Sequence, residues 1–151
     1  MWALSRCVHD ASHDYAWSIG LNDGSMYAST DGARVPMFIT ARRGVPRDGN
    51  RPTILYGYGG FSICGQPLCS PAIAAWFEHG GVYAVANLCD GGEYGRAWHE
   101  AGMKTRKQHV FDDCIAAAEY LIAQKWANSR RRAICGRSNG GLRAAAVEEQ
   151  R

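Results

Sequence analysis

The chain has 151 residues, of which 46% are hydrophobic and 21% are charged, as in a globular domain with a real core. The formal net charge of +3 rests partly on short arginine runs, and no basic stripe interleaved with aromatic residues points to nucleic acid. No apolar run reaches the ~18 residues of a membrane-spanning helix, and charged residues interrupt the N-terminus where a secretory signal is apolar.

The first part of the chain predicts little regular structure and then a hairpin. Residues 1–25 show no clear period, so we interpret them as a poorly defined N-terminal segment, with a linker remnant as one hypothesis. Within it, His9 and His13 have a helical metal-site spacing but lack a further ligand, which favours a polar surface turn. Apolar and β-branched runs at 26–30 and 35–42 flank an Asp-Gly pair, which predicts a β-hairpin.

The rest of the chain alternates between strand and helix patterns. Residues 53–56 predict a buried strand, 71–79 a short helix, 82–88 a second strand and 110–124 a longer helix. In that longer helix the apolar residues share one face: Val110, Phe111, Cys114, Ile115, Ala118, Leu121 and Ile122. Residues 133–135 predict a last strand, and a helix runs through 142–147. This alternation predicts an α/β domain, residues 26–151, with a mainly parallel sheet.

Three loops follow the predicted parallel strands, at 57–61, 90–95 and 136–140. In such sheets the functional groups gather beyond the carboxyl ends of the strands. The last loop has the pattern G-x-S-x-G around Ser138, which is typical of a sharp strand-to-helix turn that exposes a serine nucleophile. A pattern with three fixed positions also occurs by chance, so Ser138 is a candidate from this motif alone.

The first loop leaves another interpretation open, because a glycine-rich loop after a strand can also bind phosphates. However, residues 57–62 do not match G-x-G-x-x-G, no P-loop motif occurs, and Tyr58 and Phe61 would crowd a pyrophosphate. Either aromatic side chain could simply pack in the core. A tyrosine flanked by glycines could also hold its hydroxyl over the sheet edge and donate to an oxyanion.

Residues from about 26 to 147 resemble the catalytic domain of the prolyl oligopeptidase family of serine peptidases. The matching runs cover about four-fifths of the chain and read RVPMFI (34–39), LYGYGGF (55–61), AVAN (84–87), GGEYG (91–95) with WH (98–99), FDD (111–113), AAEYLI (117–122) and GxSNGGL (136–142). The resemblance implies a partial α/β-hydrolase fold, namely the first half of a mainly parallel sheet with flanking helices.

The resemblance also implies roles for individual residues. Ser138 is then the acylating nucleophile, and the oxyanion hole pairs the Tyr58 hydroxyl with the backbone N–H of Asn139. Phe61 matches a phenylalanine that lines the proline pocket. The implied substrate is a short proline-containing peptide, and no metal or organic cofactor enters the implied chemistry.

The sequence departs from the family pattern in three places. Cys89 and Asp90 replace an arginine and a glycine, and Arg137 stands where a glycine usually precedes the nucleophile, so a long side chain needs room at a tight turn. The catalytic order Ser, Asp, His is also incomplete, because residues 139–151 contain no aspartate and no histidine. We therefore expect a truncated peptidase domain that is inactive alone.

Two other functions remain open at this point. The chain could be a non-catalytic binding or interaction protein of hydrolase ancestry, or an α/β nucleotide-binding domain. Its six cysteines form no C-x-x-C pair and fit buried thiols in a reducing compartment, so we expect a cytoplasmic protein without membrane or nucleic-acid partners.

Overall fold

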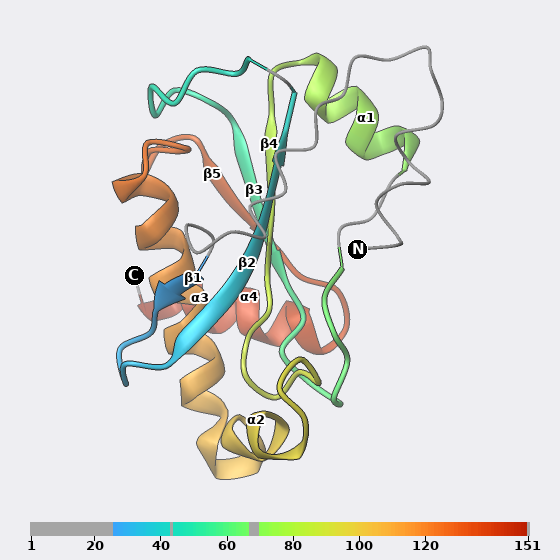
Figure 1. The fold of residues 1–151 in the computed structure, drawn as a ribbon, viewed down its shortest axis with the longest axis vertical. Coiled ribbons are helices and arrows are strands. Elements are labelled where there is room, and N and C mark those ends of the chain that lie inside the picture. The colour runs from blue at the N-terminus through green and yellow to red at the C-terminus, as the bar shows by residue number, and fades with distance from the viewer. Residues whose placement is uncertain (1–25, 43, 67–69, 151) are drawn as a thin grey trace.

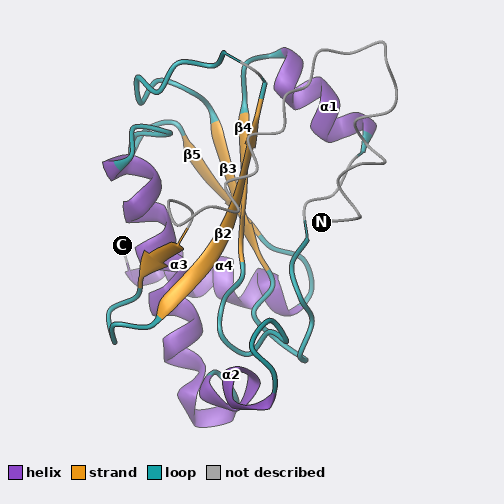
Figure 2. Ribbon diagram, viewed as in Figure 1, coloured by secondary structure: helices purple, strands orange, loops and turns teal. Residues whose placement is uncertain are grey.

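The computed structural model describes residues 26–42, 44–66 and 70–150. It confirms the α/β fold, with a five-stranded sheet flanked by helices (Figures 1 and 2). The interpretation of residues 1–25, with His9 and His13, lies outside the described residues. In chain order the elements are β1 Met26–Ala28, β2 Arg34–Ala41, β3 Thr53–Gly57, α1 Pro71–Glu78, β4 Val82–Ala86, α2 Arg96–Ala101, η2 Lys104–Arg106, α3 Lys107–Ala123, β5 Arg132–Cys135 and α4 Asn139–Gln150.

The strands follow the order β1-β2-β4-β3-β5 across the sheet. β1 and β2 form the predicted antiparallel hairpin, and β2 also runs antiparallel to β4. β3 lies between β4 and β5 and is parallel to both. The sheet is therefore mixed, and its parallel part consists of the three strands that precede the predicted functional loops. Within the described residues, β5 forms one edge of the sheet and β1 the other.

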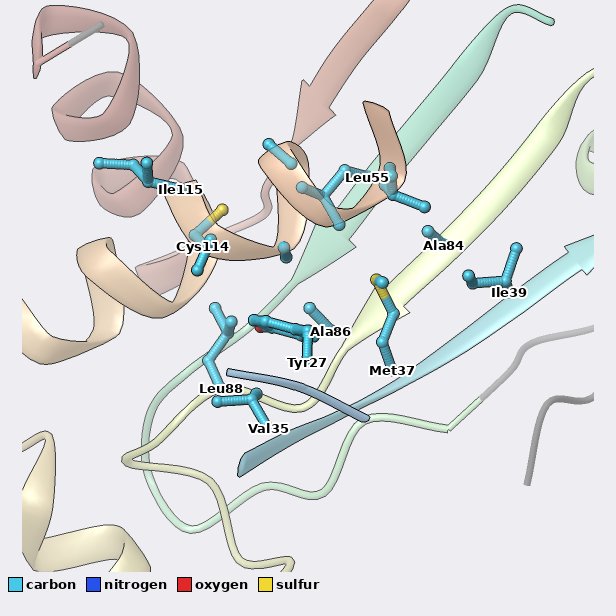
Figure 3. Packing of buried hydrophobic residues seen from close by; sticks show 14 of the residues in the cluster. Tyr27, Val35, Met37, Ile39, Leu55, Ala84, Ala86, Leu88, Cys114 and Ile115 are labelled. Atoms are coloured by element: carbon cyan, nitrogen blue, oxygen red, sulfur yellow. The ribbon is translucent and has the colours of Figure 1, made fainter. Parts of the chain in front are cut away.

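The main core lies between the sheet and α3. Alternate residues of β2, β3 and β4 point to this face, where Leu55, Val82 and Ala84 are fully buried. Figure 3 shows side chains from these strands on the face of the sheet that faces α3, where Cys114 belongs to the same buried cluster. Three consecutive alanines of α3, residues 116–118, are buried as well, so the helix packs closely against its neighbours. α1 lies on the other side of the sheet from α3 (Figure 1).

Local signals explain the helix starts. Ser70 caps α1, because its Oγ accepts a hydrogen bond of 3.3 Å from the N–H of Ile73, and Pro71 occupies the first helical position.

α3 begins three residues before the predicted start at Val110, and α4 begins directly after Ser138. α2 and η2 have too few residues to show a hydrophobic period, which is why the sequence did not predict them. In the parts of the chain that the structure describes, no helix is long and apolar enough to cross a membrane.

The parallel strands bring three loops to one edge of the sheet. β3, β4 and β5 run in the same direction, and the loops that follow them lie at the lower end of the sheet in Figure 1. These are the loops at 57–61, 90–95 and 136–140, which the sequence pattern had singled out. The topology thus gathers the candidate functional residues on a rigid scaffold.

Candidate active site

Ser138 lies on the tight turn between β5 and α4. Its φ is 57°, a left-handed conformation that is uncommon for a residue with a side chain and typical of functional sites. The turn closes only because Gly136 has no side chain, since a Cβ there would collide with the carbonyl oxygen of Gly140. Ser138 itself is exposed. The fold therefore presents one serine, in a strained conformation, above the end of the sheet.

Backbone hydrogen bonds fix this turn to the start of α4. The N–H of Gly140 donates to the carbonyl of Arg137 at 3.0 Å, and the N–H of Gly141 donates to the carbonyl of Ser138 at 2.9 Å. Asn139 is the first residue of α4, so its N–H belongs to the first turn, where amide groups have no partner four residues back. The positive end of the helix dipole therefore lies next to Ser138 and favours a negative charge there.

The side chain of Asn139 joins this turn to the first glycine-rich loop. Its Nδ2 lies 2.9 Å from the carbonyl oxygen of Gly59 and 3.4 Å from that of Tyr58. A Cβ at Gly60 would fall on the Asn139 amide, so the close approach of the two segments requires glycine at that position. The family resemblance had implied a role for the Asn139 backbone only, and this side-chain contact was not predicted.

An open cavity of about 470 Å³ lies beside Ser138. Ser138 and Tyr58 both line it, as expected for the two groups proposed from the sequence. The other lining residues are Tyr56, Ile63, Cys64, Gly65, Gln66 and Arg137. Arg137 is the one charged residue among these eight. Arg137 is exposed, so the turn accommodates this long side chain without burying its charge.

Phe61 lies near the cavity but not in its wall. Its ring is tilted against that of Tyr58 with 6.5 Å between centroids, and 72% of the residue is exposed. Phe61 and the following Ser62 both adopt left-handed conformations, with φ of 54° and 55°. The proposed contact of Phe61 with the substrate proline stays a prediction. An aromatic side chain this exposed, next to an open cavity, is available for an apolar ligand group.

A cluster around the buried carboxyl of Asp90, absent from the sequence predictions, contacts this loop through Lys107. Asp90 follows β4, is 6% exposed and has a φ of 67°. Its Oδ2 lies 2.7 Å from Lys107 Nζ, and its Oδ1 lies 2.7 Å from His99 Nδ1. We call these three residues the Asp90 cluster. Because they come from three separate segments, no spacing pattern in the sequence could have indicated it.

Cys89, the other departure in the second loop, is buried beside Asp113 of α3. The N–H of Cys89 donates to Asp113 Oδ2 at 2.9 Å. Burial raises the pKa of the Cys89 thiol, and the charge of Asp113 adds to the shift. Burial likewise raises the pKa of Asp113, although this hydrogen bond opposes the shift. Cys89 therefore stays a neutral, unreactive thiol at neutral pH.

Within residues 26–42, 44–66 and 70–150, no group of three histidine, cysteine, aspartate or glutamate side chains could hold a metal ion. The chemistry that the described site offers is that of a serine hydroxyl with hydrogen-bond donors nearby. Ser138, the Tyr58 side chain and the start of α4 meet at one place. The assignment of Ser138 as a nucleophile beside an oxyanion site requires this placement and stays a prediction.

Comparisons with known proteins agree with this geometry. Residues 69–151, more than half of the chain, match the prolyl oligopeptidase family. The prolyl endopeptidase of Elizabethkingia meningoseptica is 50% identical over 125 residues, which cover 83% of this chain and 18% of the relative.

Solved structures extend the similarity to three dimensions. A structure from a study of two prolyl endopeptidases superposes with a TM-score of 0.82 at 56% identity, covering 83% of this chain and 19% of the other. Prolyl oligopeptidase B of Galerina marginata, solved as a serine-to-alanine mutant bound to a hydrolysis and macrocyclization substrate, gives 0.78 at 40% identity, covering 81% and 17%. The chain thus spans about a fifth of the length of these relatives. By sequence and by fold, it belongs to the prolyl oligopeptidase family.

Proposed function

We propose that Ser138 is the acylating nucleophile of a serine peptidase that cleaves short peptides after proline. The observation that carries this proposal is the conformation of Ser138, which has a φ of 57° on the strand-to-helix turn and lines a cavity together with Tyr58. Family membership supports a peptidase, and the placement of the serine supports the covalent mechanism.

In the proposed reaction, Ser138 Oγ attacks the carbonyl carbon of the scissile bond. The hydroxyl proton passes to a general base, and the carbonyl oxygen becomes an oxyanion. The Tyr58 hydroxyl and the Asn139 N–H donate hydrogen bonds to this oxyanion. When the tetrahedral intermediate collapses, the amine leaves with a proton from the base, and water then hydrolyses the acyl-enzyme by the reverse proton path.

The proposed mechanism also requires a histidine as the general base and an aspartate that orients it. Residues 139–151 contain neither, whereas the order of such triads is Ser, then Asp, then His. We therefore propose that these 151 residues are inactive alone, because Ser138 without a base is an ordinary alcohol. His99 is not the base in this proposal, because it precedes Ser138 in the chain and does not line the cavity that Ser138 and Tyr58 line.

The substrate preference rests on the relatives and on the exposed aromatic surface. The matched relative from Elizabethkingia meningoseptica is a prolyl endopeptidase. In this chain, the exposed ring of Phe61 next to Tyr58 offers an apolar surface for a proline ring. We propose a cytoplasmic enzyme that needs no cofactor for this chemistry.

The test is turnover by the full-length protein that carries this segment. A fluorogenic peptide with proline before the cleaved bond should be hydrolysed, its alanine analogue should react much more slowly, and Ser138→Ala should abolish both reactions. Hydrolysis that survives Ser138→Ala would exclude this serine as the nucleophile. If the wild-type protein hydrolyses neither peptide, the proposal fails in favour of a non-catalytic function.

A further inference from the structure

The carbonyl of Gly59 accepts two hydrogen bonds from opposite parts of the fold. One comes from Asn139 Nδ2 at 2.9 Å, next to the candidate nucleophile, and the other from Lys107 Nζ at 2.7 Å, at the start of α3. A carbonyl oxygen has two lone pairs, so these two donors use its full capacity. The two hydrogen bonds therefore fix the orientation of the Gly59 carbonyl. Tyr58 is the preceding residue in the chain.

Lys107 in turn depends on Asp90. Its Nζ lies 2.7 Å from Asp90 Oδ2, and only 20% of the lysine side chain and 9% of the aspartate side chain are exposed. A buried ammonium group needs a counter-charge, because an unpaired buried ion carries a large desolvation penalty. The carboxylate therefore keeps Lys107 turned inward, where it reaches Gly59.

Asp90 is anchored at three further points. Its N–H donates to the carbonyl of Trp98 at 3.1 Å, its carbonyl accepts from the N–H of Ser62 at 3.1 Å, and its Oδ1 lies 2.7 Å from His99 Nδ1. Ser62 follows directly after the loop at 57–61. The same residue thus contacts the glycine-rich loop through its main chain and supports it through Lys107.

The backbone of Asp90 adopts a conformation that is unfavourable for most residues. Its φ of 67° is left-handed, which a residue other than glycine adopts at some cost unless its surroundings compensate. Here the surroundings supply the Lys107 ammonium group, the His99 ring and two main-chain hydrogen bonds. Two of these contacts, with the Ser62 N–H and with Lys107, connect Asp90 to the loop at 57–62.

We propose that Asp90 and Lys107 are positioning residues that hold the Tyr58 loop, through the Gly59 carbonyl, in register with the Ser138 turn. This inference goes beyond the proposed function and rests on it only for the kinetic part of its test. The pair touches no substrate. It acts by fixing where the Tyr58 hydroxyl stands relative to Ser138, and a displacement of about 1 Å at a reacting centre can lower turnover roughly a hundredfold.

The test uses the full-length protein that carries this segment. Asp90→Asn removes the charge while keeping the shape and the tolerance for a left-handed φ. Lys107→Met removes the ammonium group while keeping the length of the side chain. Lys107→Arg is the conservative rescue, and Lys104→Met, which alters an exposed lysine three residues earlier, is the matched control. The double variant Asp90→Asn with Lys107→Met completes a double-mutant cycle.

We expect either single charge-removing substitution to lower kcat roughly tenfold to a hundredfold with KM changed less than about threefold. The double variant should be no worse than the worse single variant, because the two residues act as one unit. Lys107→Arg should retain most of the activity, and Lys104→Met should match the wild type. A change in KM alone, or losses that multiply in the double variant, would overturn the proposal.

A second readout does not need activity. Hydrogen–deuterium exchange should accelerate in peptides covering residues 57–66 of Asp90→Asn and Lys107→Met, while exchange in α1 stays as in the wild type. Unchanged exchange at 57–66, or equal acceleration throughout the domain, would contradict a local positioning role. If the wild-type protein shows no turnover that depends on Ser138, the proposed function fails, and this exchange comparison alone decides the positioning role. Should Lys107→Met fail to fold, Asp90→Asn and Lys107→Arg decide it.

Discussion

Asn139 Nδ2 donates a hydrogen bond of 2.9 Å to the carbonyl of Gly59, so the residue after the candidate nucleophile is tied to the loop that carries Tyr58. The two residues are 80 positions apart in the sequence. This hydrogen bond connects the turn that carries Ser138 to the loop that carries Tyr58. A shift of one segment relative to the other therefore breaks it.

The contact predicts a strong effect of Gly60→Ala. A Cβ at residue 60 would fall on the Asn139 amide and displace it from Gly59. We expect a loss of about 1–3 kcal/mol in the free energy of unfolding, from overpacking and the broken hydrogen bond. Denaturant titration measures this loss in the free energy of unfolding. Gly141→Ala is the control, because a Cβ there meets only the Gly136 carbonyl at 3.8 Å and alanine favours the helix. Equal stability of the two variants would show that the approach at Gly60 is not tight.

Tyr58→Phe tests the oxyanion role in the full-length protein. The ring that packs 6.5 Å from Phe61 is retained and only the hydroxyl is lost. If that hydroxyl stabilises the oxyanion, kcat should fall roughly a hundredfold or more while KM changes little. Tyr56→Phe is a suitable control, because Tyr56 lines the same cavity. A parallel loss of binding and turnover in Tyr58→Phe would mean that this side chain only shapes the cavity.

The position of Arg137 predicts a preference for substrate peptides with a negative charge near the cleaved bond. It is the one charged side chain in the cavity wall, and it lies next to Ser138. Arg137→Gln should lower kcat/KM for peptides with a carboxylate near the cleaved bond roughly tenfold more than for neutral analogues, as expected for loss of one charge-assisted hydrogen bond of about 1.5 kcal/mol. Lys125→Gln, which removes an exposed charge elsewhere, controls for net charge. The same loss for both peptides would argue against a role in selectivity.

Asp113 predicts a pH dependence of stability. Burial raises its pKa in the folded state above the ordinary 3.8, so between these two values the folded state binds more protons than the unfolded state. The free energy of unfolding should therefore fall as the pH rises from about 4 through the folded-state pKa, by at most about 1.4 kcal/mol per pH unit. Asp113→Asn should flatten this slope in denaturant titrations.

The exposed carboxyl of Glu148 on α4 provides the control. Glu148→Gln removes one negative charge, as Asp113→Asn does, without changing a buried group. If both variants alter the slope equally, net charge and not burial at Asp113 explains the pH dependence. A slope of the opposite sign in the wild type would contradict the assignment of Asp113.

The sequence predicted the elements wherever hydrophobic periodicity was long enough to be seen. The hairpin around Asp31, the strands at Leu55 and Ala84, and the helix containing Leu121 are all present. The pattern also brought Ser138 and Tyr58 into one place, because parallel strands end at one edge of a sheet.

Contacts between distant charged residues were beyond the sequence. Asp90 appeared only as a departure from a glycine, and nothing in its neighbourhood indicated that Lys107 and His99 would meet it. The buried carboxyl of Asp113 was hidden as well, since helix periodicity assigns polar residues to the exposed face. Such residues depend on pairing that only the folded chain provides.

The most direct measurement is the site of covalent modification by a fluorophosphonate. The full-length protein that carries this segment would be labelled, digested and mapped by mass spectrometry, with Ser138→Ala beside it. The account predicts one adduct, on Ser138, that is lost in the variant and suppressed by a proline-containing peptide. An adduct on another serine, or no adduct in a folded wild-type protein, would contradict the claim that Ser138 is the nucleophile.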